Sequence, residues 1–274
     1  MIARCLSLLL CTCIALPSLA LDRPAKLDSK VKKMVENLVD LSNRKDAPGV
    51  DQVIAELKGE KASCVLLAEA FGAPDRPEHV QLDIARAMVD LKCPDVRALA
   101  LKVLGDVDKE NRGAFAVIFA RTKDNELTAP TAALAGSSRP FDKEMACDAL
   151  QLLGDKAGIP ALVKATQDSF FSVRQKAAAA LASFPSPEAR EALCRLATAD
   201  SNIGVQQKAM ESLGTLADIQ SVPCLIDVLR GRPGAATLAA HAALQKVTGM
   251  DLGTDASAWD SWWEKYKKDH KPRK

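Results

Sequence analysis

The sequence predicts an all-α solenoid, a stack of helix pairs in which each pair packs only on its neighbours. Short segments in the second half of the chain repeat every 31 or 32 residues, which is the pattern of repeat proteins. Apolar residues inside these segments recur at helical spacing, and no stretch alternates apolar and polar residues for long enough to form a strand. Hydrophobic residues make up 48% of the 274 residues and aromatic residues only 4%. The core is therefore expected to consist mainly of Ala, Leu and Val, which suits closely packed helices.

The first twenty residues are predicted to be an export signal. Arg4 supplies a positive charge, an apolar stretch follows, and Pro17 ends that stretch. Ser18-Leu19-Ala20 then places small residues at the two positions that a signal peptidase reads. The mature chain is expected to begin at Leu21 and to reside in the periplasm or outside the cell, and no later apolar run is long enough to span a membrane. A buried N-terminal helix and a lipoprotein anchor are the alternatives.

The charge of the mature chain argues against nucleic-acid binding. Removing residues 1–20 takes away Arg4 and no acid, which leaves 36 basic and 35 acidic residues. Proteins that bind nucleic acid neutralise phosphates with a basic surface, and this balance provides none. The C-terminal tail is rich in Lys and Arg, but Glu264 and Asp269 dilute it, and cations are favoured near the end of a helix by its dipole. We therefore expect no nucleic-acid partner.

Amphipathic patterns predict four helices in the N-terminal part of the chain. The first carries its apolar residues on one helical face. These residues are Val31, Met34, Val35, Leu38 and Val39. A second helix is expected around 53–57, a third over 62–71 and a fourth over 78–91.

The repeat itself is clearest over residues 144–248. Its anchoring leucines are separated by 31, 32 and 31 residues, and they are Leu150, Leu181, Leu213 and Leu244. The segments 173–181 and 205–213 align without gaps, and an alanine run in the first of these lets neighbouring helices approach closely.

Each unit has a second half that repeats as well. A leucine follows the anchor after 12 residues in three units, at Leu162, Leu193 and Leu225. Pro160, Pro187 and Pro223 lie near the start of these second helices, where a missing N–H does no harm. A linking aspartate precedes two of the first helices, and Asp168 and Asp200 suit a turn or a helix N-cap. Each unit is therefore predicted to be a helix, a short turn and a second helix.

These units resemble the short bacterial HEAT-like repeats, the class first named from phycobilisome lyases. The resemblance implies one right-handed superhelix of helix pairs over residues 21–274. A further unit is expected upstream, because Val96, Arg97, Ala100 and Leu104 match the first-helix residues of segment 173–181. Leu104 and Leu150 lie 46 residues apart, which is no whole number of units. Residues 106–141 are therefore predicted to hold an irregular repeat.

The mature chain contains five cysteines: Cys64, Cys93, Cys147, Cys194 and Cys224. Their spacing of about one repeat is unlike that of a metal site, and most lie among apolar helical residues, so buried Cys acting as a small hydrophobe is the expected role. A Cys64–Cys93 or Cys194–Cys224 disulfide between neighbouring repeats stays open. An odd number leaves at least one cysteine free.

A final helix is predicted over residues 257–269. Ser257 to Asp260 has the pattern of a capping box that begins it. All three tryptophans of the chain lie here, and the aromatic residues share one helical face: Trp259, Trp262, Trp263 and Tyr266. We interpret this face as the cap that the open end of a solenoid needs. An aromatic platform for a ligand is the alternative.

The sequence shows no pattern of catalysis, metal binding or cofactor binding. His79, His241 and His270 are widely separated, and no Cys-x-x-Cys, phosphate loop, Gly-x-Gly-x-x-Gly or Gly-x-Ser-x-Gly occurs. His241 lies among alanines and is expected to be packed in the core. No catalytic residue, metal ligand or cofactor is predicted.

A protein-binding surface is the predicted function. In HEAT-like arrays the second helices line the concave face, which is the usual interaction surface of a solenoid. The candidate partner-binding residues outside the core are Lys164, Gln167, Arg190, Arg195, Asp227 and Arg230. The chain is thus expected to be an exported, non-catalytic scaffold. The alternative hypothesis is an accessory lyase or another enzyme built on the same scaffold.

Overall fold

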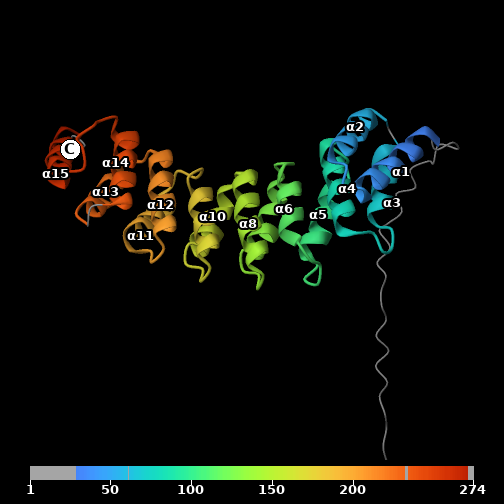
Figure 1. Cartoon of the computed structure of the whole chain (residues 1–274), viewed down its shortest axis with the longest axis horizontal. Helices are drawn as coiled ribbons and strands as arrows, with labels where there is room; N and C mark the ends of the chain where they lie inside the picture. The colour runs from blue at the N-terminus through green and yellow to red at the C-terminus, as the bar shows by residue number, and fades with distance from the viewer. Residues whose placement is uncertain (1–28, 61, 232–233, 271–274) are drawn as a thin grey trace, which may run out of the picture.

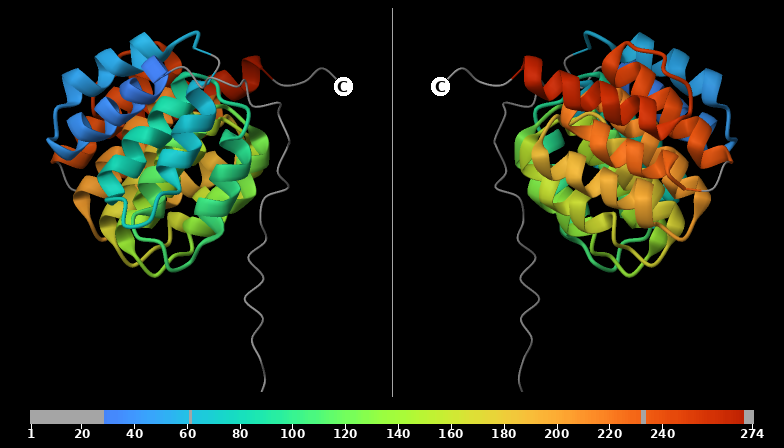
Figure 2. Two further views of the ribbon diagram at one scale, coloured as in Figure 1. Left: turned by 90° about the vertical axis from the view of Figure 1, so that its right-hand side faces the viewer. Right: turned by 90° about the vertical axis from the view of Figure 1, so that its left-hand side faces the viewer.

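A computed structural model describes residues 29–60, 62–231 and 234–270, so the predicted export signal lies outside the described ranges. Within these ranges the regular structure is helical throughout, and the helices stack side by side in one elongated row (Figure 1). From either end the row has a rounded outline (Figure 2). The all-α solenoid predicted from the sequence is confirmed. None of the helices in the described ranges has the length and apolar character needed to cross a bilayer.

Six helix pairs form the row. The first helices are α4 (Glu78–Asp90), α6 (Arg112–Ala120), α8 (Pro140–Leu153), α10 (Phe171–Leu181), α12 (Ile203–Leu216) and α14 (Ala235–Thr248). The second helices are α5 (Val96–Gly105), α7 (Thr128–Leu134), α9 (Ile159–Ala165), α11 (Pro187–Ala199), α13 (Val222–Leu229) and α15 (Ala256–Asp269). Each first helix contacts the next first helix, and the second helices from α5 to α13 each pack on the first helix of the following pair. Two layers of helices result.

Three helices cover the N-terminal end of the row. They are α1 (Ser29–Asn43), α2 (Ala47–Leu57) and α3 (Ser63–Phe71). Helix α1 contacts α2, α3 and α4, so it seals the first regular pair. Its buried residues include Val31, Val35 and Leu38, as the amphipathic pattern predicted.

A single buried position sets the period of the stack. It is fully buried in every first helix from α4 to α14, with spacings of 31, 31, 31, 32 and 31 residues, and its occupants are Met88, Phe119, Leu150, Leu181, Leu213 and Leu244. The leucine pattern therefore extends two units further towards the N-terminus than the leucines alone indicate, because Phe and Met take the same place there.

The structure differs from the sequence alignment around residues 95–141. Helix α5, which the alignment matched to the first helices through Val96 and Leu104, contacts α6 and α7 in the manner of a second helix. Residues 106–141 hold a regular pair, α6 and α7, joined through the 3-10 turn η1 (Asn125–Leu127). The spacing of 46 residues arises because Leu104 and Leu150 belong to different layers.

An aspartate caps the turn inside three of the pairs. Asp124, Asp155 and Asp218 accept hydrogen bonds from the amides two residues later at 3.1, 3.0 and 2.9 Å. They open η1, η2 (Lys156–Gly158) and η3 (Ile219–Ser221). These capped turns satisfy amides that the following helix leaves without a partner.

The linkers between pairs use a second repeated cap. Asp106, Ser137, Asp168 and Asp200 each accept a hydrogen bond from the amide two residues later, at 3.2, 3.2, 2.9 and 2.8 Å. The turn role expected for Asp168 and Asp200 is therefore confirmed, while the N-cap of α12 is Asn202. The linkers lie along one edge of the stack, at the bottom in Figure 1, opposite the turns inside the pairs.

Two disulfides join neighbouring elements in the part of the chain that the structure describes. Cys64 of α3 bonds to Cys93, directly after α4, and Cys194 of α11 bonds to Cys224 of α13. Both pairings that the sequence left open are thus formed. Cys147 stays free and buried in α8, and this burial raises the pKa of its thiol to about 12, so that it is a neutral, apolar group at pH 7.

Candidate partner-binding surface

Three of the predicted site residues occupy the same place in successive repeats. Lys164, Arg195 and Asp227 each lie two residues after the buried leucine of a second helix, and all three are exposed. Because α9 contacts α11 and α11 contacts α13, these side chains form a row across three neighbouring second helices. We call this row the second-helix face.

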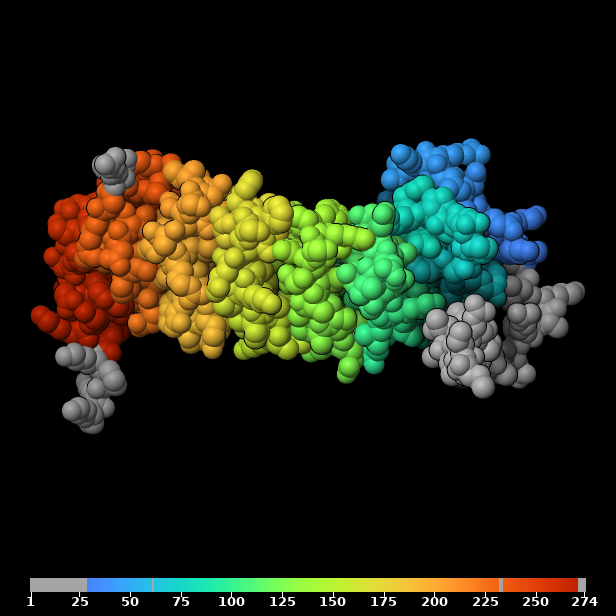
Figure 3. All heavy atoms as spheres, turned by 90° about the horizontal axis from the view of Figure 1, so that it is seen from below, coloured from blue at the N-terminus to red at the C-terminus, as the bar shows by residue number. Residues whose placement is uncertain are grey.

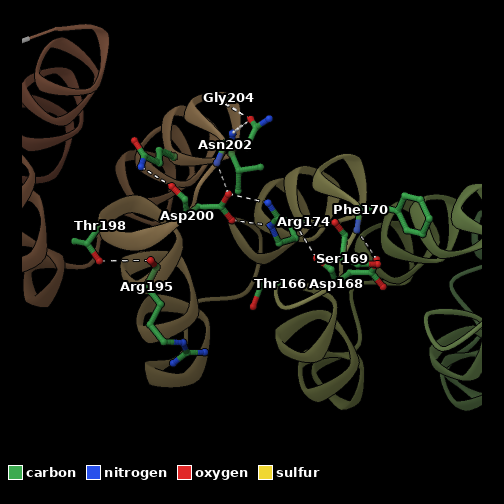
Figure 4. Close-up of polar contacts among 12 residues, drawn as sticks. Thr166, Asp168, Ser169, Phe170, Arg174, Arg195, Thr198, Asp200, Asn202 and Gly204 are labelled. Carbon is green, nitrogen blue, oxygen red and sulfur yellow. Dashed lines mark hydrogen bonds and ion pairs between the residues drawn. The ribbon is translucent and has the colours of Figure 1, made fainter.

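A shallow groove runs between α9 and α11. Gln167 and Arg195 line it together with Thr166, Ala192, Leu196, Ala199 and Asp200, and its volume is about 390 Å³. The Arg195 side chain points away from the polar contacts of the linker (Figure 4). Neither Lys164 nor Arg195 takes part in an ion pair with another residue of the described ranges, so both cations are available to a partner.

Arg190 does not belong to this surface. It lies three residues before Leu193. The equivalent positions of the neighbouring repeats are occupied by Ile159 and Val222, which are buried. Its side chain is only 20% exposed, and its guanidinium reaches Asp218 of the following turn at 2.8 Å. The arginine therefore joins two repeats, a role that its polarity alone did not indicate.

Arg230 and Asp227 are held in ion pairs. Arg230 contacts Asp227 within α13 and donates to both carboxylate oxygens of Asp260 in α15, at 2.7 and 2.9 Å. These contacts tie the last helix to its neighbour. Of the six predicted residues, Lys164, Gln167 and Arg195 thus remain the ones with free polar groups on one surface.

An ion-pair ladder across the linkers was not predicted. Arg174 of α10 donates to both oxygens of Asp200 at 2.6 and 2.8 Å, and to the carbonyl of Asp168 at 2.8 Å (Figure 4). Lys143 of α8 reaches the Asp168 carboxylate at 2.6 Å. Helices α8 and α10 thus each bind the linker that follows their own pair. The regular spacing of a basic residue and an aspartate in the sequence could have indicated this ladder.

The ladder explains the acidity of its carboxyl groups. The hydrogen bond from Arg174 holds the pKa of Asp200 below its ordinary value, against the opposing effect of burial. Burial raises the pKa of Asp168, but the hydrogen bonds from Lys143 and the Phe170 amide outweigh it, so the pKa lies below the ordinary value. These charges hold neighbouring repeats together, and Asp200 also lines the groove between α9 and α11.

A larger open groove lies at the turns that follow α4 and α6. Its volume is about 770 Å³, and its charged lining residues are Lys92, Arg97, Arg121, Lys123 and Asp124. Arg97 is paired with Asp124, and Arg121 reaches Asp90 at 2.7 Å. The sequence interpretation missed this groove, although Lys92 and Lys123 lie one repeat apart.

His241 is half-buried and bonded, where the sequence predicted a histidine packed in the core. Its Nε2 lies 2.9 Å from Asp251 in the loop between α14 and α15, and this contact lowers the pKa of the Asp251 carboxyl. No cluster of three or more His, Cys, Asp or Glu residues in the described ranges is arranged to hold a metal ion.

The tryptophan helix begins differently from the prediction. Asp255 caps α15 by accepting from the Ser257 amide at 3.0 Å, so Ser257 is inside the helix and forms no capping box. Trp259 is fully buried and donates to the Gly253 carbonyl at 2.8 Å. Trp262, Trp263 and Tyr266 are half-buried and stacked on one another, with ring centroids 5.2 to 6.4 Å apart.

Comparison with known proteins identifies the repeats. Residues 127–214 and 159–245 match the family of HEAT repeats. Residues 127–245 are HEAT repeats. No curated protein matches its sequence.

Several solved structures resemble the HEAT-repeat chain. An engineered protein shares 20% identity, with a TM-score of 0.47, and the match covers 80% of this chain and 97% of that one. The complex of CpcE and CpcF of phycocyanin lyase from Nostoc sp. shares 16% identity, with a TM-score of 0.44 and coverage of 92% and 99%. Human deoxyhypusine hydroxylase in complex with glycerol shares 16% identity, with a TM-score of 0.41 and coverage of 81% and 97%.

Proposed function

We propose that this HEAT-repeat protein is an exported, non-catalytic scaffold that binds a protein partner on its second-helix face. The positions of Lys164 and Arg195 are the main support for this proposal. They occupy equivalent, exposed positions on adjacent repeats and lie outside the ion pairs that hold the stack together. Repetition of one exposed position along a solenoid produces an extended surface for a partner.

The ion pairs of the stack support a non-catalytic role. The carboxyl groups of Asp168 and Asp200, whose pKa is lowered, are engaged by Lys143 and Arg174 across linkers. Perturbed groups of a catalytic site typically lie in a cleft beside a place for substrate. Here cations of the same chain engage both carboxylates, including that of Asp200 at the groove between α9 and α11, and these pairs fix the spacing of neighbouring repeats.

The disulfides support export. Disulfides persist in oxidising compartments and are rare in the cytosol. Two of them, Cys64–Cys93 and Cys194–Cys224, occur in this chain behind a predicted signal segment. Intact-mass measurement of the protein from its native envelope is expected to give a chain that starts at Leu21 and carries two disulfides. A chain that retains Met1, or one that is fully reduced, would contradict export.

The binding surface is tested by capture of partners on the immobilised chain 21–274, followed by cross-linking and mass spectrometry. Lys164→Glu combined with Arg195→Glu is expected to abolish capture of the main partner, because both cations of the face are reversed. A control combines Lys33→Glu with Lys58→Glu, which reverses two exposed cations on α1 and at the end of α2. Equal capture by both variants, or cross-links confined to the first helices, would contradict the proposed surface.

A further inference from the structure

Large apolar side chains are exposed along the edge of the stack that carries the linkers. They come from four successive linkers or from the first turn of the helix that follows, and Figure 3 looks onto this edge. We call them the linker row: Val107, Phe141, Phe170, Phe171 and Ile203. Their exposed fractions run from 46% to 70%.

The row concentrates aromatic side chains that the rest of the chain buries. Three of the seven phenylalanines lie in it, whereas the other four, Phe71, Phe115, Phe119 and Phe184, are buried. Single exposed apolar residues are ordinary, but a continuous run of them marks an interaction site. Packing within this chain therefore does not explain why these large apolar side chains occur at this edge.

Charges along most of the row are already neutralised. Lys143 pairs with Asp168 and lies 5.7 Å from the Phe170 ring centroid, and Arg174 pairs with Asp200. Figure 4 shows the Phe170 ring turned away from these contacts, towards the preceding repeat. A partner would therefore contact this part of the edge mainly through apolar side chains.

The Val107 end of the row is different because it is acidic. Asp106, Asp108 and Glu110 are exposed there, and no ion pair within the described ranges engages their carboxylates. The cations near them are Lys109, Arg112 and Arg139, and Arg112 donates to the Leu104 carbonyl at 3.2 Å. Lys109 turns inward to Gln81 at 2.7 Å, and Arg139 donates to the Lys109 carbonyl at 3.0 Å.

The linker backbone cannot pair with an added strand. The amides of Asp108, Arg139, Phe170 and Asn202 already donate to side chains of their own linkers. Strand addition needs a row of free backbone groups. A partner that satisfies its own backbone hydrogen bonds, namely a helix, fits this edge.

The spacing of the repeats matches the rise of an α-helix. Adjacent packed helices lie about 8–10 Å apart, and a helix advances about 10.5 Å in seven residues. A helix with an apolar residue every seventh position therefore places one side chain on each linker. Three heptads, roughly 31 Å, span the four linkers.

We propose that the linker row binds an amphipathic helix of a protein partner, with its apolar face on the row and a basic end over Asp106, Asp108 and Glu110. This surface lies on the linker edge and not on the second-helix face. Either proposal can therefore fail without the other.

The test uses a fluorescein-labelled synthetic peptide of three heptads, with Leu at two positions of each heptad, polar residues elsewhere and three Lys at one end. Fluorescence anisotropy measures its binding to the full chain. The variant Phe141→Ser/Phe171→Ser/Ile203→Ser is expected to bind at least tenfold more weakly. The matched control, Val65→Ser/Leu101→Ser/Leu152→Ser, removes three exposed apolar side chains outside the row and is expected to bind as the parent does. Circular dichroism verifies that both variants fold.

Further experiments separate the apolar and the acidic contributions to peptide binding. Asp106→Asn/Asp108→Asn/Glu110→Gln is expected to weaken binding several-fold at low salt and to remove its salt dependence. A scrambled peptide of the same composition, without a continuous apolar face, is expected not to bind. Equal binding of the scrambled peptide, or unchanged binding by the row variant, would overturn the proposal. Row-dependent binding to phosphatidylglycerol vesicles without peptide binding would do so too, because the row would then serve a membrane surface.

Discussion

Gly113 lies where α6 packs closely against α8. Its amide donates to the buried carboxylate of Asp142 at 2.9 Å. A Cβ at this position would lie 2.6 Å from the Met145 Cβ and 2.9 Å from the Asp142 Cα, and neither atom belongs to the flexible end of a side chain. Only glycine fits between the two helices without moving a backbone.

Gly113→Ala is expected to destabilise the protein by about 1–3 kcal/mol, the usual cost of overpacking a core. Urea unfolding followed by circular dichroism measures this loss. Gly105→Ala is the control, because a Cβ there would meet nothing within 4 Å. Equal stability of the two variants would show that α6 can shift away from α8 at little cost.

Arg174 and Asp200 form the best-buried ion pair of the ladder, with side chains 14% and 5% exposed. Arg174→Met keeps the aliphatic stem but leaves the carboxylate without its cation, and such a loss typically costs about 3 kcal/mol. The pKa of Asp200 is lowered in the folded state, so its stabilisation is present above the ordinary value of 3.8 and is lost as the pH falls through the folded value. The difference between parent and variant is therefore expected to shrink below about pH 3.8.

Urea unfolding at pH 7 and at pH 3 checks this dependence. The control, Arg44→Met, removes an exposed i,i+4 pair with Asp40 and is expected to change little at either pH, because water and salt screen exposed pairs. A difference for Arg174→Met that is independent of pH would mean that lost packing, and not the ion pair, accounts for it.

At the scale of elements, the disulfides tie specific helices together. Cys194 and Cys224 are 30 residues apart in sequence, and their bond encloses α12 between α11 and α13. Closing a loop of this length typically stabilises a protein by about 3 kcal/mol. Cys194→Ala/Cys224→Ala is expected to lose about this much and to show faster hydrogen exchange in α11 to α13.

A reducing agent provides the internal control. It is expected to destabilise the parent but to leave unchanged a variant in which Cys64, Cys93, Cys194 and Cys224 are all Ala. Reduction without any effect on the parent would mean that packing alone holds these helices.

The elements show where sequence reasoning succeeds. Periodicity predicted the helices around the leucine anchors. Buried residues there recur both with the turn of the helix and with the length of the repeat. It misplaced α5, since Val96 and Leu104 satisfy the apolar pattern of either layer. The anchor of α6 was overlooked because Phe119 replaces leucine.

The candidate site was harder to predict for a physical reason. Exposure of a polar residue depends on its register within the repeat, and Arg190 falls at a register that other repeats bury. Phe141 and Phe171, which composition would assign to a core, are exposed because they stand in the first turn of a helix at the edge of the stack. Pairing across repeats, such as that of Arg174 with Asp200, depends on geometry between units.

At the scale of the whole molecule, a stack of this kind is expected to unfold from its ends. Each repeat contacts only its neighbours, so the terminal pair has one interface fewer than an interior pair. All three tryptophans lie in α15, which makes their emission a probe of the C-terminal end. In urea, this emission is expected to shift to the red before the helical circular dichroism is lost.

Trp259→Ala is expected to widen the gap between the two transitions, because truncation of a buried aromatic costs about 3–5 kcal/mol. Trp262 and Trp263 remain as reporters. Phe115→Ala, a buried truncation in α6, is the control, and it is expected to move the loss of helicity more than the tryptophan signal. Coincident transitions in the parent and in both variants would show that the stack unfolds as a single unit and that α15 is no separate cap.

The Cys194–Cys224 bond also governs how the chain transmits mechanical force. A pull on the two ends passes through the covalent bridge, so the residues between the two cysteines carry no tension until the bond is reduced. About 30 residues, roughly 100 Å of extended chain, are thereby withheld from stretching. The oxidised protein can therefore be extended less than its number of residues implies. Reduction of the bond under force would lengthen the chain by the enclosed segment.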